Sequence, residues 1–335
     1  MKFSSLLILF LLSFVVVSFL QIELVKAQGT IYIRSDGSVE GTDNISRDGN
    51  VYTFIGNIFG SIFVEKDDAI IYGGGFILEG DGSGRGLDFV DDITNITVKN
   101  LQIRFFDVGI HLSNCSHALI ESNFILNNYE GIRINGGFNN SIINNRIENS
   151  SNNGISVFFN TRQNQISENT ITNNWVGVLF HLYSEGNTLS NNIITENRGI
   201  GVWLDGGSNN KIVQNNITDN TIGVFSTRPI NSTVHHNNFV NNTFQVDIYG
   251  NDPVIGTWDN GSEGNYWDTY TGTDNNGDGI GDTPYIINEN NQDNYPLMNI
   301  VEIPEFPSWS IISIVFTLTL VILIFKTKLK KKVLE

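Results

Sequence analysis

Five stretches of the chain repeat one pattern: NFILNNYEGIRI (residues 123–134), NRIENSSNNGISV (145–157), NTITNNWVGVLF (169–180), NIITENRGIGVWL (192–204) and NNITDNTIGVFS (215–226). Each stretch begins with asparagine and has an isoleucine two residues later. Polar residues then lead to a glycine that is followed by a β-branched residue. Self-similarity at a period of about 23 residues is typical of repeat architectures.

Several positions keep this register along the chain. They are an apolar position (Ile103, Ile125, Ile147, Ile171, Ile194, Ile217, Phe239), an asparagine (Asn123, Asn145, Asn169, Asn192, Asn215, Asn237) and a glycine (Gly109, Gly131, Gly154, Gly177, Gly201, Gly223). Apolar and polar residues alternate between them, which indicates short strands, and no helical stripe of useful length is present. Asn, Gly and Ser between the strands favour tight or left-handed turns.

A repeat of this kind predicts an all-β fold, a right-handed single-stranded parallel β-helix with coils of about 23 residues. Coils stacked at about 4.8 Å place identical side chains above one another. Isoleucine ladders then fill the interior, and asparagine ladders hydrogen-bond along the stack. A leucine-rich repeat would need a leucine consensus and a helix in each unit, and the chain has neither.

Composition excludes other classes of protein. The 335 residues carry a formal net charge of −16, one cysteine and 46 asparagines. An acidic chain does not fit a nucleic-acid binder. A single cysteine excludes a disulfide scaffold, and abundant Asn and Gly argue against helical bundles.

Both ends of the chain predict membrane signals. Lys2 and the apolar run that follows it favour a signal peptide over residues 1–27, with an uncleaved anchor as the alternative. Residues 309–325 form an uncharged segment long enough for a transmembrane helix, and residues 326–335 form a basic cytoplasmic tail. The body of the protein is therefore expected on the extracellular face of the membrane, an address compatible with the chain's N-x-S/T glycosylation sequons.

Between these signals we predict four segments. Residues 28–90 form an N-terminal cap with the first irregular coils, and residues 91–250 form the regular repeats. Residues 251–300 form an acidic, aromatic C-terminal cap, and residues 301–308 form a linker. Caps are expected because the end coils of a solenoid otherwise expose strand edges.

The repeat resembles the NosD-like β-helix proteins, within the wider pectin-lyase-like and carbohydrate-binding β-helix group. The strings GNYWD (264–268), DNNGDGIGD (274–282) and DNYP (293–296) are similar to the C-terminal segment of archaeal members. Pro304, Glu305 and Phe306 resemble an archaeal PEF-type sorting signal, whose alternative is a simple stalk before a permanent helix. The family resemblance implies periplasmic copper binding in support of nitrous oxide reductase maturation. The relatives of the fold imply polysaccharide binding or cleavage.

The residues themselves make copper unlikely as a cofactor. Cu(I) sites need clustered Cys, Met and His, whereas Cys115, Met298 and five histidines are scattered along the chain. His235 and His236 are adjacent on a predicted strand, so their side chains are expected on opposite faces.

A structural Ca²⁺ ion in the C-terminal cap is the stronger metal prediction. No Lys or Arg occurs from residue 229 to residue 325. The spacing of a calcium loop is met by five residues: Asp274, Asn276, Asp278, Ile280 (through its carbonyl) and Asp282. The acidic residue expected at position 12 is replaced by Tyr285, and a solvated acidic loop is the alternative.

The outward residues after each glycine predict a binding surface. The residues two and four places after each glycine of the repeat, among them His111, Ser156 and Leu179, are all expected to face solvent. Of these, His181, Trp203, Asp205 and Phe225 fall on neighbouring coils. Aromatic rings beside polar groups stack on sugars and bind their hydroxyls, so we expect non-catalytic binding of a polysaccharide or surface-layer glycan. A polysaccharide lyase, a glycoside hydrolase and a rigid spacer are the alternatives. No pair of carboxylates on this face indicates catalysis, so catalytic residues stay unassigned.

Overall fold

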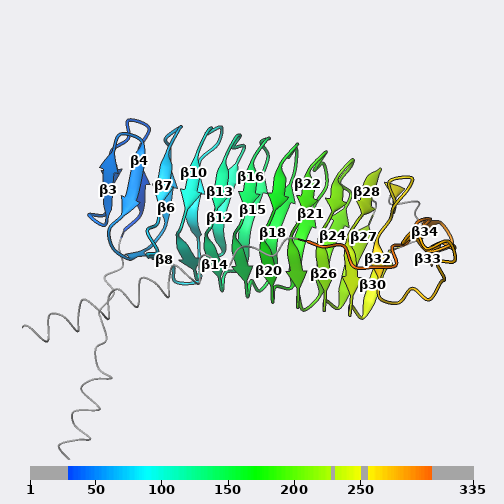
Figure 1. The fold of residues 1–335 in the computed structure, drawn as a ribbon. Helices are drawn as coiled ribbons and strands as arrows, with labels where there is room; N and C mark the ends of the chain where they lie inside the picture. Colours follow the sequence, from blue (N-terminus) through cyan, green and yellow to red (C-terminus); the bar gives the residue numbers. More distant parts are fainter. Residues whose placement is uncertain (1–28, 228–230, 250–255, 304–335) are drawn as a thin grey trace, which may run out of the picture.

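The described part of this computed structural model, residues 29–227, 231–249 and 256–303, winds into a stack of turns with three sheets along its length (Figure 1). Neighbouring strands in each sheet come from successive turns and run parallel, apart from two antiparallel pairs at the N-terminal end. The predicted all-β parallel β-helix is confirmed. The signal peptide, the sorting motif, the transmembrane helix and the basic tail that we predict lie outside the described residues. Within those ranges, no helix is both long and apolar enough to cross a membrane.

Sheet A holds the longest strands, of up to six residues, and its order is β2(Val39–Glu40), β1(Ile31–Ile33), β6(Ile62–Val64), β9(Arg85–Phe89), β12(Val108–Ser113), β15(Glu130–Asn135), β18(Asn153–Phe158), β21(Val176–Phe180), β24(Ile200–Asp205), β27(Ile222–Thr227) and β30(Phe244–Ile248). Sheet B follows it in each turn, with the order β3(Ile45–Asp48), β4(Val51–Phe54), β7(Ile70–Tyr72), β10(Thr97–Lys99), β13(Leu119–Glu121), β16(Ser141–Ile143), β19(Gln165–Ser167), β22(Thr188–Ser190), β25(Lys211–Val213), β28(Ser232–His235) and β31(Gly256–Thr257).

Sheet C completes each turn, with the order β5(Ile58–Phe59), β8(Ile77–Glu79), β11(Gln102–Arg104), β14(Phe124–Leu126), β17(Arg146–Glu148), β20(Thr170–Thr172), β23(Ile193–Thr195), β26(Asn216–Thr218), β29(Asn238–Val240) and β32(Tyr266–Trp267). A separate hairpin, β33(Tyr285–Asn288) and β34(Asn291–Asp293), lies at the C-terminal end of the stack (Figure 1).

The interior is built from the apolar ladders that the repeat predicts. Ile125 pairs with Ile147, and Ile147 pairs with Ile171, in a register that continues to Phe239 and Trp267. These side chains are fully buried or nearly so. A parallel sheet that faces an apolar interior favours such β-branched residues, since their stacked side chains leave little empty space.

Buried asparagines run beside this core as continuous hydrogen-bonded rows. Asn145 donates its side-chain amide to Asn169 Oδ1 at 3.1 Å, and Asn169 donates to Asn192 Oδ1 at 3.0 Å. Each asparagine also bonds the backbone of a neighbouring turn; the bond from Asn145 Nδ2 to the Ile120 carbonyl is 2.8 Å. The predicted amide ladders are thus confirmed, and they pair polar groups that would otherwise be buried without partners.

The ladder glycines serve a purpose other than turning the chain. A Cβ atom on Gly154 would lie 2.7 Å from the carbonyl oxygen of Gly177, and the φ angle of Gly154 is not positive. Glycine is therefore needed for space, because adjacent turns approach closely here. The left-handed conformation falls instead on corner residues such as Asn144, Glu168 and His236, with φ between 54° and 60° at equivalent positions.

Aromatic rings close the C-terminal end of the core. Trp267 stacks between Phe239 and Tyr285, with ring centroids 4.3 Å away on either side. The buried Asp293 carboxylate accepts hydrogen bonds from the Trp267 indole at 2.9 Å and from the backbone N–H of Asn265 at 2.7 Å. Burial raises the pKa of Asp293 despite these donors. Trp267 therefore covers the last complete turn and is itself held by the hairpin segment.

Candidate functional site

The sugar-binding surface that we predict lies on the outward side of sheet A, on β24 and β27 and directly after β21. The structure brings its four residues together. His181 Nε2 lies 3.3 Å from Asp205 Oδ2, and the Trp203 and Phe225 ring centroids lie 5.6 Å apart. We call His181, Trp203, Asp205 and Phe225 the sheet A patch. All four side chains are partly exposed, because inward and outward residues alternate along each strand.

Thr227 connects the polar and aromatic halves of the patch. Its hydroxyl donates to Asp205 Oδ1 at 2.6 Å and accepts a 3.2 Å hydrogen bond from the Trp203 indole nitrogen. The indole edge and the carboxylate are therefore held in fixed relative positions. An aromatic ring beside an oriented carboxylate can contact the apolar face of a sugar and accept its hydroxyl groups.

More aromatic residues continue the patch toward the N-terminal coils. The rings of Phe158 and Phe159 lie 5.0 and 5.5 Å from the His181 ring. Beyond them is a hollow of 470 Å³ at the corner between sheets A and B, lined by Phe138 and by polar residues that include Asn160 and Arg162. The partly exposed surface thus extends across several turns and mixes aromatic rings with hydrogen-bonding groups.

Part of the outward face differs from the prediction that all of it faces solvent. His111, Ser156 and Leu179 are only 3%, 0% and 6% exposed. His111 Nδ1 lies 2.8 Å from Asp88 Oδ1, and the Ser156 hydroxyl donates to Glu130 at 2.7 Å. The alternation along a strand predicts which side of the sheet a residue lies on. It does not predict whether side chains of neighbouring turns bury that residue.

The acidic members of this buried network, Asp88 and Glu130, were not among the residues predicted from the sequence. Asp88 also pairs with Arg85 at 3.1 Å, and Glu130 pairs with Arg133 at 2.9 Å. The hydrogen bond from Arg133 to Glu130 raises the pKa of the guanidinium. The only available signal was the register itself, which places Asp88 beside His111 on adjacent strands.

The predicted calcium loop has its acidic side chains directed at backbone amides. Asp274 accepts bonds from Gly277 N at 2.7 Å and Gly279 N at 2.9 Å, and Asp278 accepts one from Ile280 N at 2.9 Å. Asp282 accepts a 2.9 Å bond from Asn275 N. In the part of the chain that the structure describes, no three His, Cys, Asp or Glu side chains form a group suited to a metal ion. Calcium binding therefore stays a prediction from the spacing.

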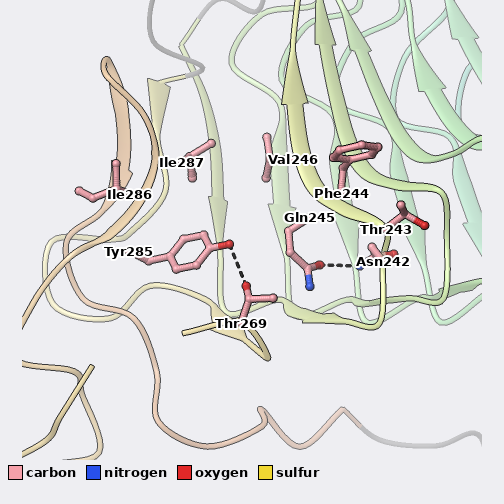
Figure 2. A pocket seen from close by; sticks show the side chains of 9 residues that line it. All are labelled: Asn242, Thr243, Phe244, Gln245, Val246, Thr269, Tyr285, Ile286 and Ile287. Carbon is pink, nitrogen blue, oxygen red and sulfur yellow. Dashed lines mark hydrogen bonds between the residues drawn. The ribbon is translucent and has the colours of Figure 1, made fainter. Parts of the chain in front are cut away.

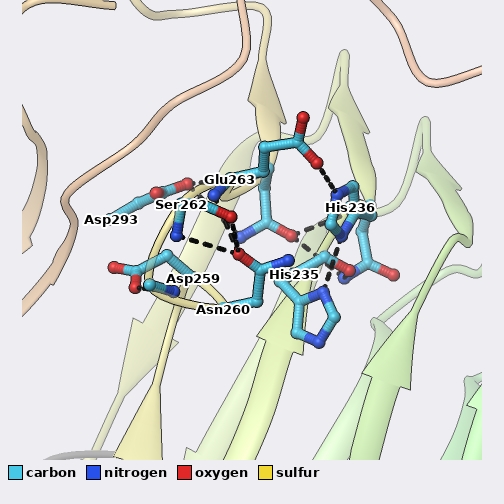
Figure 3. Close-up of polar contacts among 10 residues, drawn as sticks. His235, His236, Asp259, Asn260, Ser262, Glu263 and Asp293 are labelled. Carbon is cyan, nitrogen blue, oxygen red and sulfur yellow. Dashed lines mark hydrogen bonds and ion pairs between the residues drawn. The ribbon is translucent and has the colours of Figure 1, made fainter. Parts of the chain in front are cut away.

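The expectation for His235 and His236 is wrong. Their Nδ1 atoms lie 2.7 Å apart, and Figure 3 shows both rings on the same side of the backbone. His235 ends β28, and His236 takes the left-handed corner conformation with φ of 55°. Strand alternation stops at that corner, so both rings turn outward. Burial lowers the pKa of His235, and the neighbouring His236 and Lys211 lower it further.

The other copper-binding atoms that the sequence offers are separate from this pair. Cys115 is buried, and burial raises the pKa of its thiol to about 12, so the thiolate needed for metal binding is disfavoured. His111 and His181 each contact an acidic residue of sheet A. The described residues therefore do not present a clustered Cys, Met and His set for Cu(I).

A further hollow of 280 Å³ lies between β30 and the C-terminal hairpin (Figure 2). The hydroxyl groups of Thr269 and Tyr285 are hydrogen-bonded at 2.9 Å on one side of it, and Asn242 donates to Gln245 at 2.8 Å on another. Phe244 and Ile286 are more than half exposed at its rim. The hollow contains none of the site residues that the sequence predicts.

Comparison with known proteins gives one family and several solved structures. The structure of the periplasmic alginate epimerase AlgG is 17% identical, with a TM-score of 0.45 over 57% of this chain and 48% of that one. The AlgE6 A-module of the Azotobacter vinelandii mannuronan C-5 epimerase is 16% identical, with a TM-score of 0.42 over 59% and 66%. DFA-IIIase from Arthrobacter chlorophenolicus in complex with DFA-III is 14% identical, with a TM-score of 0.38 over 62% and 57%.

The chain spans about half the length of AlgG. No curated protein matches it. A family described as "Periplasmic copper-binding protein (NosD)" matches residues 43–272. Because that match covers well over half of the 335 residues, the chain belongs to the NosD family.

Proposed function

We propose that this protein binds carbohydrate without cleaving it, along the outward side of sheet A. The observation that carries the proposal is the Trp203 and Phe225 ring pair beside the Asp205 carboxylate, which Thr227 holds in place. Partly exposed rings stack on the apolar faces of sugars, and carboxylates accept hydroxyl hydrogens. The adjacent rings and the hollow at Phe138 lengthen this surface, which suits a chain of sugars more than a single one.

Glycan-array binding by the full-length protein tests this proposal. We expect Trp203→Ala to lower the affinity for the recognised glycan by at least about tenfold, equivalent to ~1.4 kcal/mol of binding free energy. Trp175→Ala is the matched control, because Trp175 is 53% exposed and lies outside the patch. Equal binding by both variants would place the glycan elsewhere, and absence of binding by the unaltered protein would leave a rigid spacer.

The alternative function is cleavage of an acidic polysaccharide by a lyase or a glycoside hydrolase. Release of unsaturated or reducing sugar ends by the unaltered protein would establish an enzyme in place of a binding protein.

We also propose that the β-helix is displayed outside the cell and anchored by residues 309–325. The uncharged segment and the lysines after it support this topology, and the family's description as periplasmic agrees with an extracytoplasmic location. Protease treatment of intact cells should remove the β-helix but protect an epitope placed after residue 335. Loss of that epitope during maturation would instead indicate cleavage at the sorting motif.

A further inference from the structure

Two aromatic pairs lie on one register row along the outward side of sheet A. The row begins with Tyr32 on β1 and Phe63 on β6 and ends with Trp203 and Phe225 of the sheet A patch. Between them the row passes through one residue on each of five strands, β9 to β21, and none of the five is Phe, Tyr or Trp. The ring centroids of Tyr32 and Phe63 are 5.5 Å apart, against 5.6 Å for Trp203 and Phe225.

Each aromatic pair has linked polar groups at the same relative position. In the sheet A patch, the residues two places after the rings are Asp205 and Thr227, which are hydrogen-bonded at 2.6 Å. In the first pair they are Arg34 and Glu65, which form an ion pair at 2.9 Å. The Arg34 guanidinium also lies 3.8 Å from the centre of the Tyr32 ring. We call Tyr32, Arg34, Phe63 and Glu65 the N-terminal cluster.

The rings of the N-terminal cluster do not belong to the apolar interior. The inward residues of the same two strands are fully buried and fill the interior: Ile31, Ile33, Ile62 and Val64. Tyr32 and Phe63 alternate with them, so both rings point outward, and both are partly exposed. Because the Arg34 guanidinium lies against one face of Tyr32, Phe63 is the ring better placed to stack on a ligand.

We propose that the N-terminal cluster is a second subsite for the polysaccharide that the sheet A patch binds, an inference that rests on the proposed function. Phe63 stacks on the apolar face of one sugar, as Trp203 does on another. Arg34 donates hydrogen bonds to hydroxyl groups of that sugar, and Glu65 accepts them. Both side chains are about one-third exposed, so they can reach a ligand without leaving their ion pair.

The distance between the two subsites determines the class of ligand. Six strand steps separate Phe63 on β6 from Trp203 on β24 (Figure 1). At about 4.8 Å for each step, the two rings are ~29 Å apart. An oligosaccharide shorter than this distance reaches one subsite only. A longer chain reaches both, and its second contact is then intramolecular. The ligand is therefore a long, linear polysaccharide.

Linear oligosaccharides of graded length test the second subsite. The probes are cello-, manno-, xylo- and chito-oligosaccharides and oligogalacturonides, each from the disaccharide to chains longer than ~29 Å. Their affinity for the full-length protein is measured by calorimetry. For a series that binds, we expect the affinity to rise by at least about tenfold once the chain spans both subsites. Phe63→Ala should abolish this rise and leave the affinity for short oligomers unchanged.

Tyr72→Ala is the matched control, because Tyr72 lies on β7 of the same turn, is 42% exposed and belongs to sheet B. It should keep the rise with length. Phe63→Tyr retains a ring and should also keep it, and thermal unfolding shows whether each variant is folded.

The second subsite is overturned if the unaltered protein binds long and short oligomers equally, or if folded Phe63→Ala keeps the rise with length. Failure of the proposed function gives a different result. In that case no series binds, or Trp203→Ala binds short oligomers as tightly as the unaltered protein does, and the second subsite is overturned together with the first.

Discussion

Asn192 accepts two hydrogen bonds from Asn169 on the preceding turn, one from its backbone amide at 2.9 Å and one from its side-chain amide at 3.0 Å. Asn192 in turn donates to the next asparagine of the row, Asn215, and to the carbonyls of Ile166 and Ser190. A single buried amide therefore satisfies polar groups on three consecutive turns. The asparagine row therefore connects neighbouring coils by hydrogen bonds, beside the apolar ladder.

Replacement of Asn192 by alanine should strongly destabilise the stack. It leaves the buried backbone N–H of Asn169 without its acceptor, and it removes the amide that donates to the Ile166 and Ser190 carbonyls. Each unsatisfied buried group costs about 1–3 kcal/mol. We expect the free energy of unfolding to fall by at least about 3 kcal/mol, measured by denaturant titration followed by circular dichroism. Asn290→Ala, at an exposed asparagine of the C-terminal hairpin, should change it little. Similar losses in both variants would show that the row contributes no special stability.

A methyl group at Gly154 should destabilise by crowding. The added Cβ would lie 2.7 Å from Gly177 O, 2.9 Å from a methyl of Ile171 and 3.0 Å from Asn174 Nδ2, all in packed surroundings. Overpacking of this kind costs about 1–3 kcal/mol, so Gly154→Ala should unfold at a lower denaturant concentration. At Gly29 nothing lies within 4 Å of the added atom, and Gly29→Ala should be neutral. A neutral Gly154→Ala would mean that the turns can separate without cost.

The repeat made the interior of this fold predictable. Because each turn has nearly the same length, residues one period apart become register partners, as Ile125 and Ile147 do. The same arithmetic brought the sheet A patch together. It failed where regularity ends: at His236 the left-handed corner turns both imidazoles to one side. It also failed for His111, since burial on the outward face depends on charged neighbours such as Asp88.

Cys115 should be unreactive in the folded protein and should weaken the fold at alkaline pH. Burial raises the pKa of its thiol from 9.0 to about 12, so the folded state keeps the proton longer than the unfolded state does. The associated stability is complete below pH 9 and is lost as the pH rises from 9 toward 12. Iodoacetamide at pH 8 should label Cys115 only in denaturant, as read by mass spectrometry. Rapid labelling of the native protein would contradict the burial of this residue.

The acidic loop of residues 274–282 gives a prediction that distinguishes a calcium site from a solvated cluster of like charges. Asp274, Asp278 and Asp282 fall within nine residues, and no Lys or Arg occurs from residue 229 to residue 325 to neutralise them. Calcium would replace the backbone amides as their partner and stabilise the folded state by about 2.7 kcal/mol at a hundred times its dissociation constant. Calcium should therefore raise the melting temperature above that in a chelator, as measured by calorimetry.

Two variants distinguish the loop from the charge of the cap as a whole. Asp274→Asn removes a predicted ligand together with one negative charge, whereas Glu289→Gln removes the same charge from an exposed position outside the loop. We expect the calcium-dependent rise to disappear in Asp274→Asn and to remain in Glu289→Gln. If both variants keep the rise, the ion binds elsewhere. If calcium does not raise the melting temperature of the unaltered protein, the loop does not bind the ion. Its carboxylates then serve only to accept turn hydrogen bonds, such as those from Gly277 and Gly279 to Asp274.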